Sequence, residues 1–274
     1  MTNKGLWIRL ALTVPLVAVF IFSGISLWRT ERNYRAEAEI HESLLVFKPS
    51  LPESADVAET GNTDGLQSGS EEALPDGMSS EGQLPNASPT IYNEGIALLR
   101  ERNADVVGWI TVDGTAIDYP FVRAADNDFY LRRDIDKRYA YAGTIFMDYR
   151  CRVDFSSVNS ILYGHNMNNG SMFAGLRRFA NKEFFDNNTS GMVFLENENI
   201  PLEIFAFLVV APVDLMAYMD AGGGAESYLD FLRKQARHWR EPDLGTDDTL
   251  VTLSTCSYDF ENARAVLVAR AVGG

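Results

Sequence analysis

The sequence is short of the residues that metal-binding, disulfide-stapled and nucleic-acid-binding proteins need. Its 2 cysteines and 3 histidines are too few and too scattered for a Cys-rich zinc site, an HExxH motif or a disulfide framework. Basic residues are also scarce, since 24 Lys and Arg face 38 Asp and Glu, a formal net charge of -14. Nucleic-acid binding needs clustered basic residues. The sequence therefore predicts no metal, no cofactor and no nucleic-acid partner.

One long apolar run lies near the N-terminus. Residues 10–28 are nineteen consecutive residues without a charge, enough to cross the hydrocarbon core of a bilayer, which is about 30 Å thick. Trp7 and Trp28 flank the run, where aromatic rings favour the membrane interface. A cleaved signal peptide is the alternative, but its apolar region is usually only about 7–15 residues long. We expect residues 1–28 to be an uncleaved membrane anchor.

The charges that flank this run do not set its orientation. Lys4 and Arg9 precede it, whereas Arg29, Arg32 and Arg35 follow it, so the excess of basic residues does not favour a cytoplasmic N-terminus. The short N-terminal tail and the large C-terminal part nevertheless suit a single-pass protein of the cell membrane. We expect its C-terminal part to be extracellular.

The composition changes twice after the anchor. Residues 29–47 are rich in good helix formers and predict a juxtamembrane helix. Residues 48–90 hold eight acidic residues and one base, lack aromatics and are rich in Gly, Ser, Pro and Asn, which predicts an acidic, disordered linker. By random-coil scaling, such a linker would hold a folded domain tens of Å from the membrane. It is either a plain soluble spacer or a charged segment that repels other anionic polymers and keeps the folded domain mobile.

The remaining residues, 91–274, suffice for one folded domain with more strand than helix. Alternating apolar patterns predict strands at 106–112, 116–122, 143–147, 160–163, 192–196, 202–212, 249–255 and 265–272. Helices are predicted at 91–102, 126–133, 172–179, 182–187 and 225–239. This order favours a mainly β domain with helices, built as a closed or nearly closed mixed barrel.

Three reactive side chains stand at the predicted ends of strands. Cys256 ends the apolar strand L-V-T-L-S-T-C, and Arg264 opens the next strand. His165 follows the strand N-S-I-L-Y, with Gly164 allowing a sharp turn. An imidazole can favour a cysteine thiolate and later protonate a leaving amine. A guanidinium can stabilise an oxyanion. The pattern thus suits a cysteine nucleophile, and the alternative is that Cys256 is a small buried hydrophobe.

The other two histidines fit this chemistry less well. His41 lies close to the predicted anchor. His238 falls at the end of the predicted helix 225–239, where its positive charge would suit the helix dipole.

These motifs resemble the sortases, the membrane-anchored cysteine transpeptidases of Gram-positive bacteria. The resemblance rests on T-L-S-T-C at Thr252–Cys256, Arg264 downstream and Y-G-H at Tyr163–His165 upstream. Three further segments are similar to class B: D-V-V-G-W-I at 105–110, D-N-D-F-Y-L-R at 126–132 and G-T-I-F-M-D at 143–148. The similarity covers nearly all of 91–274 and does not extend to the linker.

The resemblance implies both a fold and a set of roles. It implies a closed eight-stranded barrel, with an N-terminal helix and a long helix before the strand that carries Cys256. Cys256 would attack a threonine carbonyl in a short sorting motif, His165 would act as acid and then as base, and Arg264 would position the substrate and stabilise the oxyanion. The residues expected to line the substrate groove are Ser254, Thr255, Asn127 and Leu131.

The partners that the resemblance implies are secreted proteins bearing a sorting motif and an amine acceptor. The acceptor is an amine of cell-wall peptidoglycan or a lysine of a pilin subunit. Pilin-building sortases of class C often carry an Asp-Pro-aromatic signature before the barrel, and residues 48–90 contain none. This favours the anchoring of surface proteins to the cell wall.

Cys151 is a departure from the family pattern, and in an exported chain it raises the question of a disulfide with Cys256. Such a bond would block the nucleophile, so we do not expect it. An acidic partner for His165 is also open. Asp148, Asp259 and Glu261 are candidates by proximity in the sequence alone.

Two other classes of protein are less consistent with the sequence. A papain-like protease places its cysteine before its histidine, whereas the order here is His, Cys, Arg. A non-enzymatic, wall-binding barrel has no reason to place these three residues at strand ends. Replacing Cys256 separates the readings, because a binding module would keep its function.

Overall fold

The computed structural model describes residues 4–50, 91–211, 224–245, 248–256 and 262–272. The long linker therefore lies outside the described residues, except for residues 48–50. The helices are α1 (Lys4–Leu45), α2 (Glu94–Arg102), α3 (Lys182–Asn187) and α5 (Gly224–Gln235), with 3-10 helices η1 (Phe129–Arg132) and η2 (Phe173–Ala180). The strands are β1 (Val106–Val112), β2 (Asp118–Val122), β3 (Ile145–Met147), β4 (Asn159–Tyr163), β5 (Ser190–Phe194), β6 (Asn199–Val210), β7 (Ala236–Trp239), β8 (Leu250–Cys256) and β9 (Arg264–Ala271).

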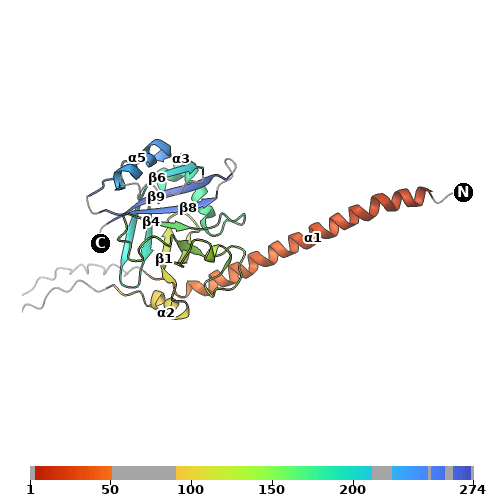
Figure 1. The fold of residues 1–274 in the computed structure, drawn as a ribbon, viewed down its shortest axis with the longest axis horizontal. Helices are drawn as coiled ribbons and strands as arrows, with labels where there is room; N and C mark the ends of the chain where they lie inside the picture. Colours follow the sequence, from red (N-terminus) through yellow and green to blue (C-terminus); the bar gives the residue numbers. More distant parts are fainter. Residues whose placement is uncertain (1–3, 51–90, 212–223, 246–247, 257–261, 273–274) are drawn as a thin grey trace, which may run out of the picture. The chain divides into compact units, whose positions relative to one another are not determined.

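Eight of these strands close into a barrel, as the sequence predicted (Figure 1). The hydrogen-bonded order is β5-β1-β2-β3-β4-β8-β9-β6, and a β5–β6 pairing closes the ring. The β2–β3 and β4–β8 pairs are parallel and the others are antiparallel. Closure leaves few open strand edges. It also brings β4, β8 and β9 side by side.

Local sequence explains where several elements begin and end. The Asp113-Gly114 pair makes the turn between β1 and β2, and Gly114 has a φ of +72°, which glycine adopts without strain. Before η1, the Asp126 carboxylate accepts hydrogen bonds from the backbone N–H groups of Asp128 and Phe129, at 2.9 and 2.8 Å. The predicted helix there is real but shorter and of the 3-10 type.

Alternation along the strands divides the apolar residues between two clusters. On β1, Ile110 and Val112 join the barrel interior, whereas Val106 and Trp109 face a second cluster outside it. This second cluster is completed by residues from α1, α2 and η1, including Leu44, Ile96, Leu99 and Tyr130. The C-terminal end of α1 is thus packed on the outer wall of the barrel.

The end of α1 contacts both the barrel and α2. Lys48 forms an ion pair of 2.6 Å with Asp118 of β2. The backbone of Phe47 lies against Gly95 of α2, where a Cβ would collide with the Phe47 carbonyl oxygen. The two sides of the linker therefore meet at the barrel. We expected the linker to hold the folded domain tens of Å from the membrane, and this stays a prediction. Among the described residues, the C-terminal end of α1 contacts the barrel directly.

The helix predicted at 225–239 is too long. α5 ends at Gln235, and Ala236–Trp239 forms β7 on β6. β6 runs over twelve residues, and β5 pairs only with its first part, so the remaining edge is open to another strand. The helix-dipole role predicted for His238 is wrong for the same reason. Its Nε2 bonds with the Ala180 carbonyl at 3.0 Å, and its ring lies against Phe185.

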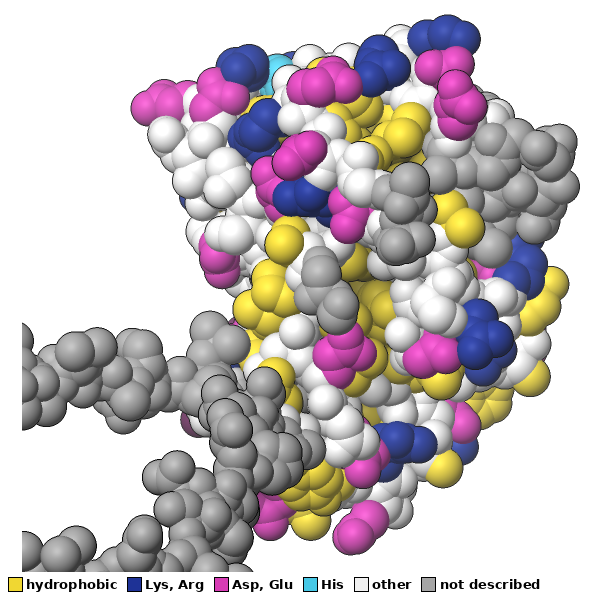
Figure 2. Space-filling view, turned by 90° about the vertical axis from the view of Figure 1, so that its left-hand side faces the viewer, with side chains coloured by type: hydrophobic (Ala, Val, Ile, Leu, Met, Phe, Trp, Pro, Cys, Tyr) yellow, Lys and Arg dark blue, Asp and Glu magenta, His cyan; other side chains and the backbone are white. Residues whose placement is uncertain are grey.

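Figure 2 shows one face of the molecule with its charged side chains. On this face, Lys and Arg side chains lie among Asp and Glu side chains and not in one continuous basic area. Ion pairs such as Arg102–Asp136 and Arg100–Glu196 reflect the same mixing of charges.

Candidate active site

Two parallel strands end at the same edge of the barrel. β4 and β8 are paired from Asn159 opposite Leu250 to Tyr163 opposite Ser254. The pairing continues one step further, because the backbone N–H of Gly164 donates to the Ser254 carbonyl at 3.2 Å. In this register, His165 lies level with Cys256. Neighbouring strands are about 4.8 Å apart, so the backbones of these two residues lie close together.

Arg264 lies on the other side of Cys256. β9 is antiparallel to β8, and its first residue, Arg264, is the direct partner of Cys256. The neighbouring strands at this edge are β4, β8 and β9 (Figure 1). The order of the backbones is therefore His165, which follows β4, then Cys256 at the end of β8, then Arg264 at the start of β9. The Arg264 charge also acts on the His165 imidazole. The structure thus brings together the three residues that the sequence selected.

The hydrogen bond of His165 fixes its tautomer. Its Nε2 lies 2.8 Å from the carbonyl oxygen of Leu131. A carbonyl oxygen only accepts, so Nε2 carries a proton and donates it. Nδ1 is therefore the nitrogen that can exchange a proton with other groups in the neutral ring.

The protonation of His165 is set by burial and by neighbouring cations. Burial, together with the positive charges of Arg132 and Arg264, holds the pKa of His165 below its usual value. The hydrogen bond to Leu131 acts in the opposite direction, because it favours the imidazolium.

Gly164 is required for a different reason than predicted. We expected a glycine to permit a sharp turn, but Gly164 is not among the glycines with positive φ. Instead, a Cβ at this position would lie 2.7 Å from Cγ of Phe173. The glycine lets η2 approach the strand end, and the Phe173 N–H donates to the His165 carbonyl at 3.0 Å.

Asp148 connects several segments close to the end of β4 through its buried carboxylate. It is fully buried, and its carboxylate forms an ion pair of 2.8 Å with Arg150. The same carboxylate accepts from Nδ2 of Asn127 at 3.0 Å and from the hydroxyl of Tyr163 at 3.1 Å. Asp148 therefore ties the end of β4 to the loop before η1. Its described contacts are with these groups and not with His165.

The other two acidic candidates, Asp259 and Glu261, lie outside the described residues. The described hydrogen-bond partner of the His165 ring is a backbone carbonyl. Sequence reasoning did not find this partner because a backbone acceptor leaves no side-chain signature.

Cys151 occupies a different part of the barrel. It is buried, and its sulfur accepts from the Ile161 N–H at 3.4 Å and lies 3.6 Å from the Asn159 carbonyl. Asn159 and Ile161 of β4 pair with Leu250 and Thr252 of β8. Thr252 precedes Cys256 by four residues. Four residues of strand span about 13 Å, whereas a disulfide needs Cα atoms within about 7 Å. Burial also raises the pKa of the Cys151 thiol.

The four predicted groove residues differ in exposure. Ser254 and Thr255 are buried in β8, and Leu131 is exposed at 36%. The Asn127 side chain is engaged on both ends, since it donates to Asp148 and accepts from the Tyr149 N–H at 3.1 Å. Asn127 thus shapes the loop before η1. A role in substrate binding remains a prediction for all four residues.

Comparisons with known proteins fit this arrangement. No protein-family model matches the chain. Over 180 residues the chain is 36% identical to sortase B of Listeria monocytogenes, covering 64% of this chain and 72% of the relative. It is 27% identical to sortase B of Staphylococcus aureus over 180 residues, covering 64% and 73%.

Solved structures give the same result. Sortase B of Clostridium perfringens has a TM-score of 0.57 at 33% identity, covering 65% of this chain and 99% of that chain. Sortase B of Bacillus anthracis, in complex with AAEK1, has a TM-score of 0.59 at 33% identity, covering 69% and 90%. A Streptococcus pyogenes class B sortase involved in pilus biogenesis has a TM-score of 0.59 at 28% identity, covering 64% and 96%.

The barrel and these relatives define the class of protein. It is a cysteine transpeptidase of the sortase type. Within that class, the chain belongs to the class B sortases.

Proposed function

We propose that this transpeptidase cleaves a C-terminal sorting motif of secreted proteins after its threonine and transfers the acyl group to an amine of the cell wall. The observation that carries this proposal is the backbone register, in which His165 just after β4, Cys256 at the end of β8 and Arg264 at the start of β9 lie at one barrel edge. A rigid strand end suits a nucleophile that must be held in place and still be reached by a peptide.

The proposed first step forms a thioester. The Cys256 thiolate attacks the threonine carbonyl carbon, and Arg264 stabilises the negative oxygen that results. The C–N bond to the next residue then breaks, and the leaving amine takes a proton from His165. Because Nε2 of His165 is held by Leu131, Nδ1 is the nitrogen that delivers this proton.

The second step reverses these roles. The neutral His165 accepts a proton from the incoming amine, whose nitrogen attacks the thioester carbonyl. The C–S bond breaks, and Cys256 returns as a thiolate beside a protonated imidazole. The thioester conserves the energy of the cleaved peptide bond, so no cofactor is consumed.

The proposed location is the cell membrane, with the barrel outside. Among the described residues, one helix is long and apolar enough to cross a membrane, and its apolar window lies near the N-terminus. Its apolar side chains, such as Phe20, Phe22 and Leu16, are exposed at 81%, 74% and 73%. A lipid environment would cover these side chains.

A second candidate function is the polymerisation of pilin subunits through a lysine amine. The observation in its favour is the similarity to the Streptococcus pyogenes class B sortase involved in pilus biogenesis. Incubation with a purified pilin distinguishes the two acceptors. A ladder of covalent polymers would replace the cell-wall amine with a pilin lysine.

The test uses the full chain in detergent as wild type, Cys256→Ala and Cys151→Ala. Each enzyme is incubated with fluorogenic peptides of the N-P-x-T-N/G/S and L-P-x-T-G types, with and without an added amine. Wild type and Cys151→Ala should cleave one peptide type and give a product whose mass includes the amine, whereas Cys256→Ala should not. Cleavage that survives in Cys256→Ala, or that no enzyme shows, would contradict the proposal.

A further inference from the structure

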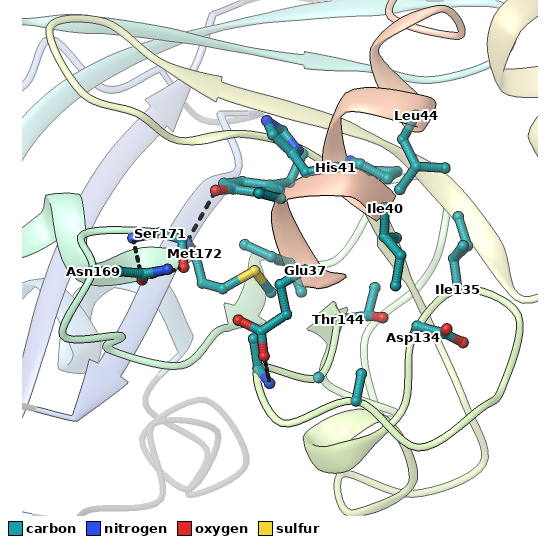
Figure 3. A pocket seen from close by; sticks show the side chains of 17 residues that line it. Glu37, Ile40, His41, Leu44, Asp134, Ile135, Thr144, Asn169, Ser171 and Met172 are labelled. Atoms are coloured by element: carbon teal, nitrogen blue, oxygen red, sulfur yellow. Dashed lines mark hydrogen bonds between the residues drawn. The ribbon is translucent and has the colours of Figure 1, made fainter. Parts of the chain in front are cut away.

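The last turns of α1 before the linker present one face to the barrel. This face, here called the docking face, consists of Glu37, Ile40, His41 and Leu44, spaced as i, i+3, i+4 and i+7. Its side chains line a cavity between α1 and the barrel wall (Figure 3). Leu44 is only 5% exposed, so α1 packs closely against the barrel wall at this point.

One chain of contacts runs from the docking face to the partner of His165. The Glu37 carboxylate accepts a hydrogen bond of 2.8 Å from the Ala142 N–H (Figure 3). The turn that contains Ala142 packs against η1. Gly143 follows with a φ of +62°, and a Cβ there would lie 2.6 Å from the Leu131 carbonyl oxygen. This is the oxygen to which His165 donates.

The turn is held to η1 by further bonds. The Ala140 N–H donates to the Arg132 carbonyl at 3.0 Å, and the Thr144 N–H donates to the Tyr130 carbonyl at 3.1 Å. A shift of the turn would therefore move the backbone on either side of Leu131.

A second chain of contacts reaches the loop that carries His165. The His41 ring lies 4.4 Å from the Tyr119 ring, centroid to centroid. The Tyr119 hydroxyl accepts from the Met172 N–H at 3.1 Å (Figure 3). Met172 pairs with Asn166, the residue after His165. Both chains of contacts thus lead from α1 to His165, one to its ring and one to its backbone.

We propose that the docking face of α1 positions His165, so that its residues act on the site through the Ala142 turn and the Met172 loop. Glu37 acts through the Ala142 turn and fixes the Leu131 carbonyl, which selects the Nε2–H tautomer. His41 and Tyr119 act through Met172 and fix the loop. This inference rests on the proposed acid and base role of His165.

Glu37 offers a matched set of variants. Glu37→Ala removes the acceptor for Ala142, whereas Glu37→Gln keeps a carbonyl oxygen in its place. Glu39→Ala is the control, because Glu39 is exposed on another face of the same helix. Loss of one supporting hydrogen bond should lower kcat by about three- to tenfold, with little change in KM. Glu37→Gln and Glu39→Ala should retain the wild-type kcat.

The second readout needs no substrate. The ¹⁵N shifts of the His165 ring report its tautomer in the full chain in detergent. We expect the Nε2–H form in wild type, Glu37→Gln and Glu39→Ala, and a mixture with the Nδ1–H form in Glu37→Ala. Tyr119→Phe, which removes the acceptor for Met172, tests the second chain of contacts and should also lower kcat.

The outcomes separate this proposal from the proposed function. Wild-type kcat and tautomer in both Glu37→Ala and Tyr119→Phe would overturn the positioning role. Equal losses in Glu37→Ala and Glu37→Gln, with an unchanged tautomer, would also overturn it. If wild type turns over no peptide, the proposed function fails, and the ring shifts still decide the positioning role. If Glu37→Ala does not fold, the test is made by measuring kcat and the His165 tautomer in Tyr119→Phe and Glu37→Gln.

Discussion

At the scale of single residues, the protonation of His165 depends on charges that belong to other elements. Burial lowers its pKa, and Arg132 on η1 and Arg264 on β9 lower it further. The acid step needs the imidazolium, so a lowered pKa restricts the fraction of enzyme that can protonate the leaving amine at neutral pH. The site is therefore tuned by its cations as well as by its geometry.

Arg132→Gln should raise the pKa of His165 toward its usual value, because it removes one of the positive charges that oppose the imidazolium. The limb of the pH–rate profile that requires the imidazolium should move to higher pH. Arg133→Gln is the matched control, since Arg133 contacts Phe129 and is not among the groups that shift His165. An NMR titration of the His165 ring measures the shift. An equal shift in both variants would contradict the electrostatic account.

Asp148→Ala should destabilise the fold and loosen the connection between the end of β4 and the loop before η1. Removing the buried carboxylate leaves Arg150, Asn127 and Tyr163 without their shared acceptor, which should cost about 3 kcal/mol. Urea unfolding measures the loss. Asp154→Ala is the control, because the Asp154–Arg152 pair is exposed and should leave the midpoint nearly unchanged.

The same group predicts a dependence on pH. Burial opposes ionisation of Asp148, but the bonds from Arg150 and Asn127 outweigh it and hold the pKa below its usual value. A depressed carboxyl pKa stabilises the fold above the unfolded-state pKa of about 3.9, and this stability is lost as the pH falls through the folded-state pKa. Acid unfolding should therefore be less steep in Asp148→Ala than in wild type. Identical acid limbs would contradict this role.

At the scale of elements, the linker joins two points that already touch. Phe47 lies against Gly95, and Lys48 is paired with Asp118, so the described residues on the two sides of the linker lie close together. In the proposed membrane location, α1 is the element that connects the barrel to the bilayer.

Replacing residues 52–88 with about ten Gly and Ser residues should preserve both kcat and the tautomer of His165. A shorter loop loses less entropy on closure, so stability should rise by about 1 kcal/mol. Urea unfolding and peptide turnover measure the two effects. The control is Gly95→Ala, which pushes a Cβ into the Phe47 backbone and should weaken the junction. Loss of turnover in the shortened enzyme alone would show that the acidic segment acts directly.

The strands were predictable because each alternates apolar and polar residues or is continuously apolar. β1 was predicted to the residue, and the register of β4 and β8 brings the backbones of His165 and Cys256 level with each other. β7 was missed because four residues after a helix carry no pattern of their own and pair only where β6 has an open edge. The spacing of Glu37, Ile40, His41 and Leu44 was a signal for the docking face, but the barrel surface that it meets is formed by distant residues.

At the scale of the whole molecule, one continuous helix joins the predicted membrane span to the barrel. α1 extends from Lys4 to Leu45, and its docking face begins nine residues after Trp28, which is about 14 Å of helix. In the proposed membrane location, this geometry keeps the barrel near the bilayer, where an exported protein with a sorting motif would emerge. The fold accounts for a class B sortase, and the proposed anchor helix is also the element that we propose to position His165.

The most direct measurement is the site of the acyl intermediate. The wild-type full chain is quenched during turnover of its preferred sorting peptide, and the adduct is located by peptide mass spectrometry. The account predicts the acyl mass on the peptide that contains Cys256 and none on the peptide that contains Cys151. An adduct on Cys151, or turnover with no adduct on Cys256, would contradict it.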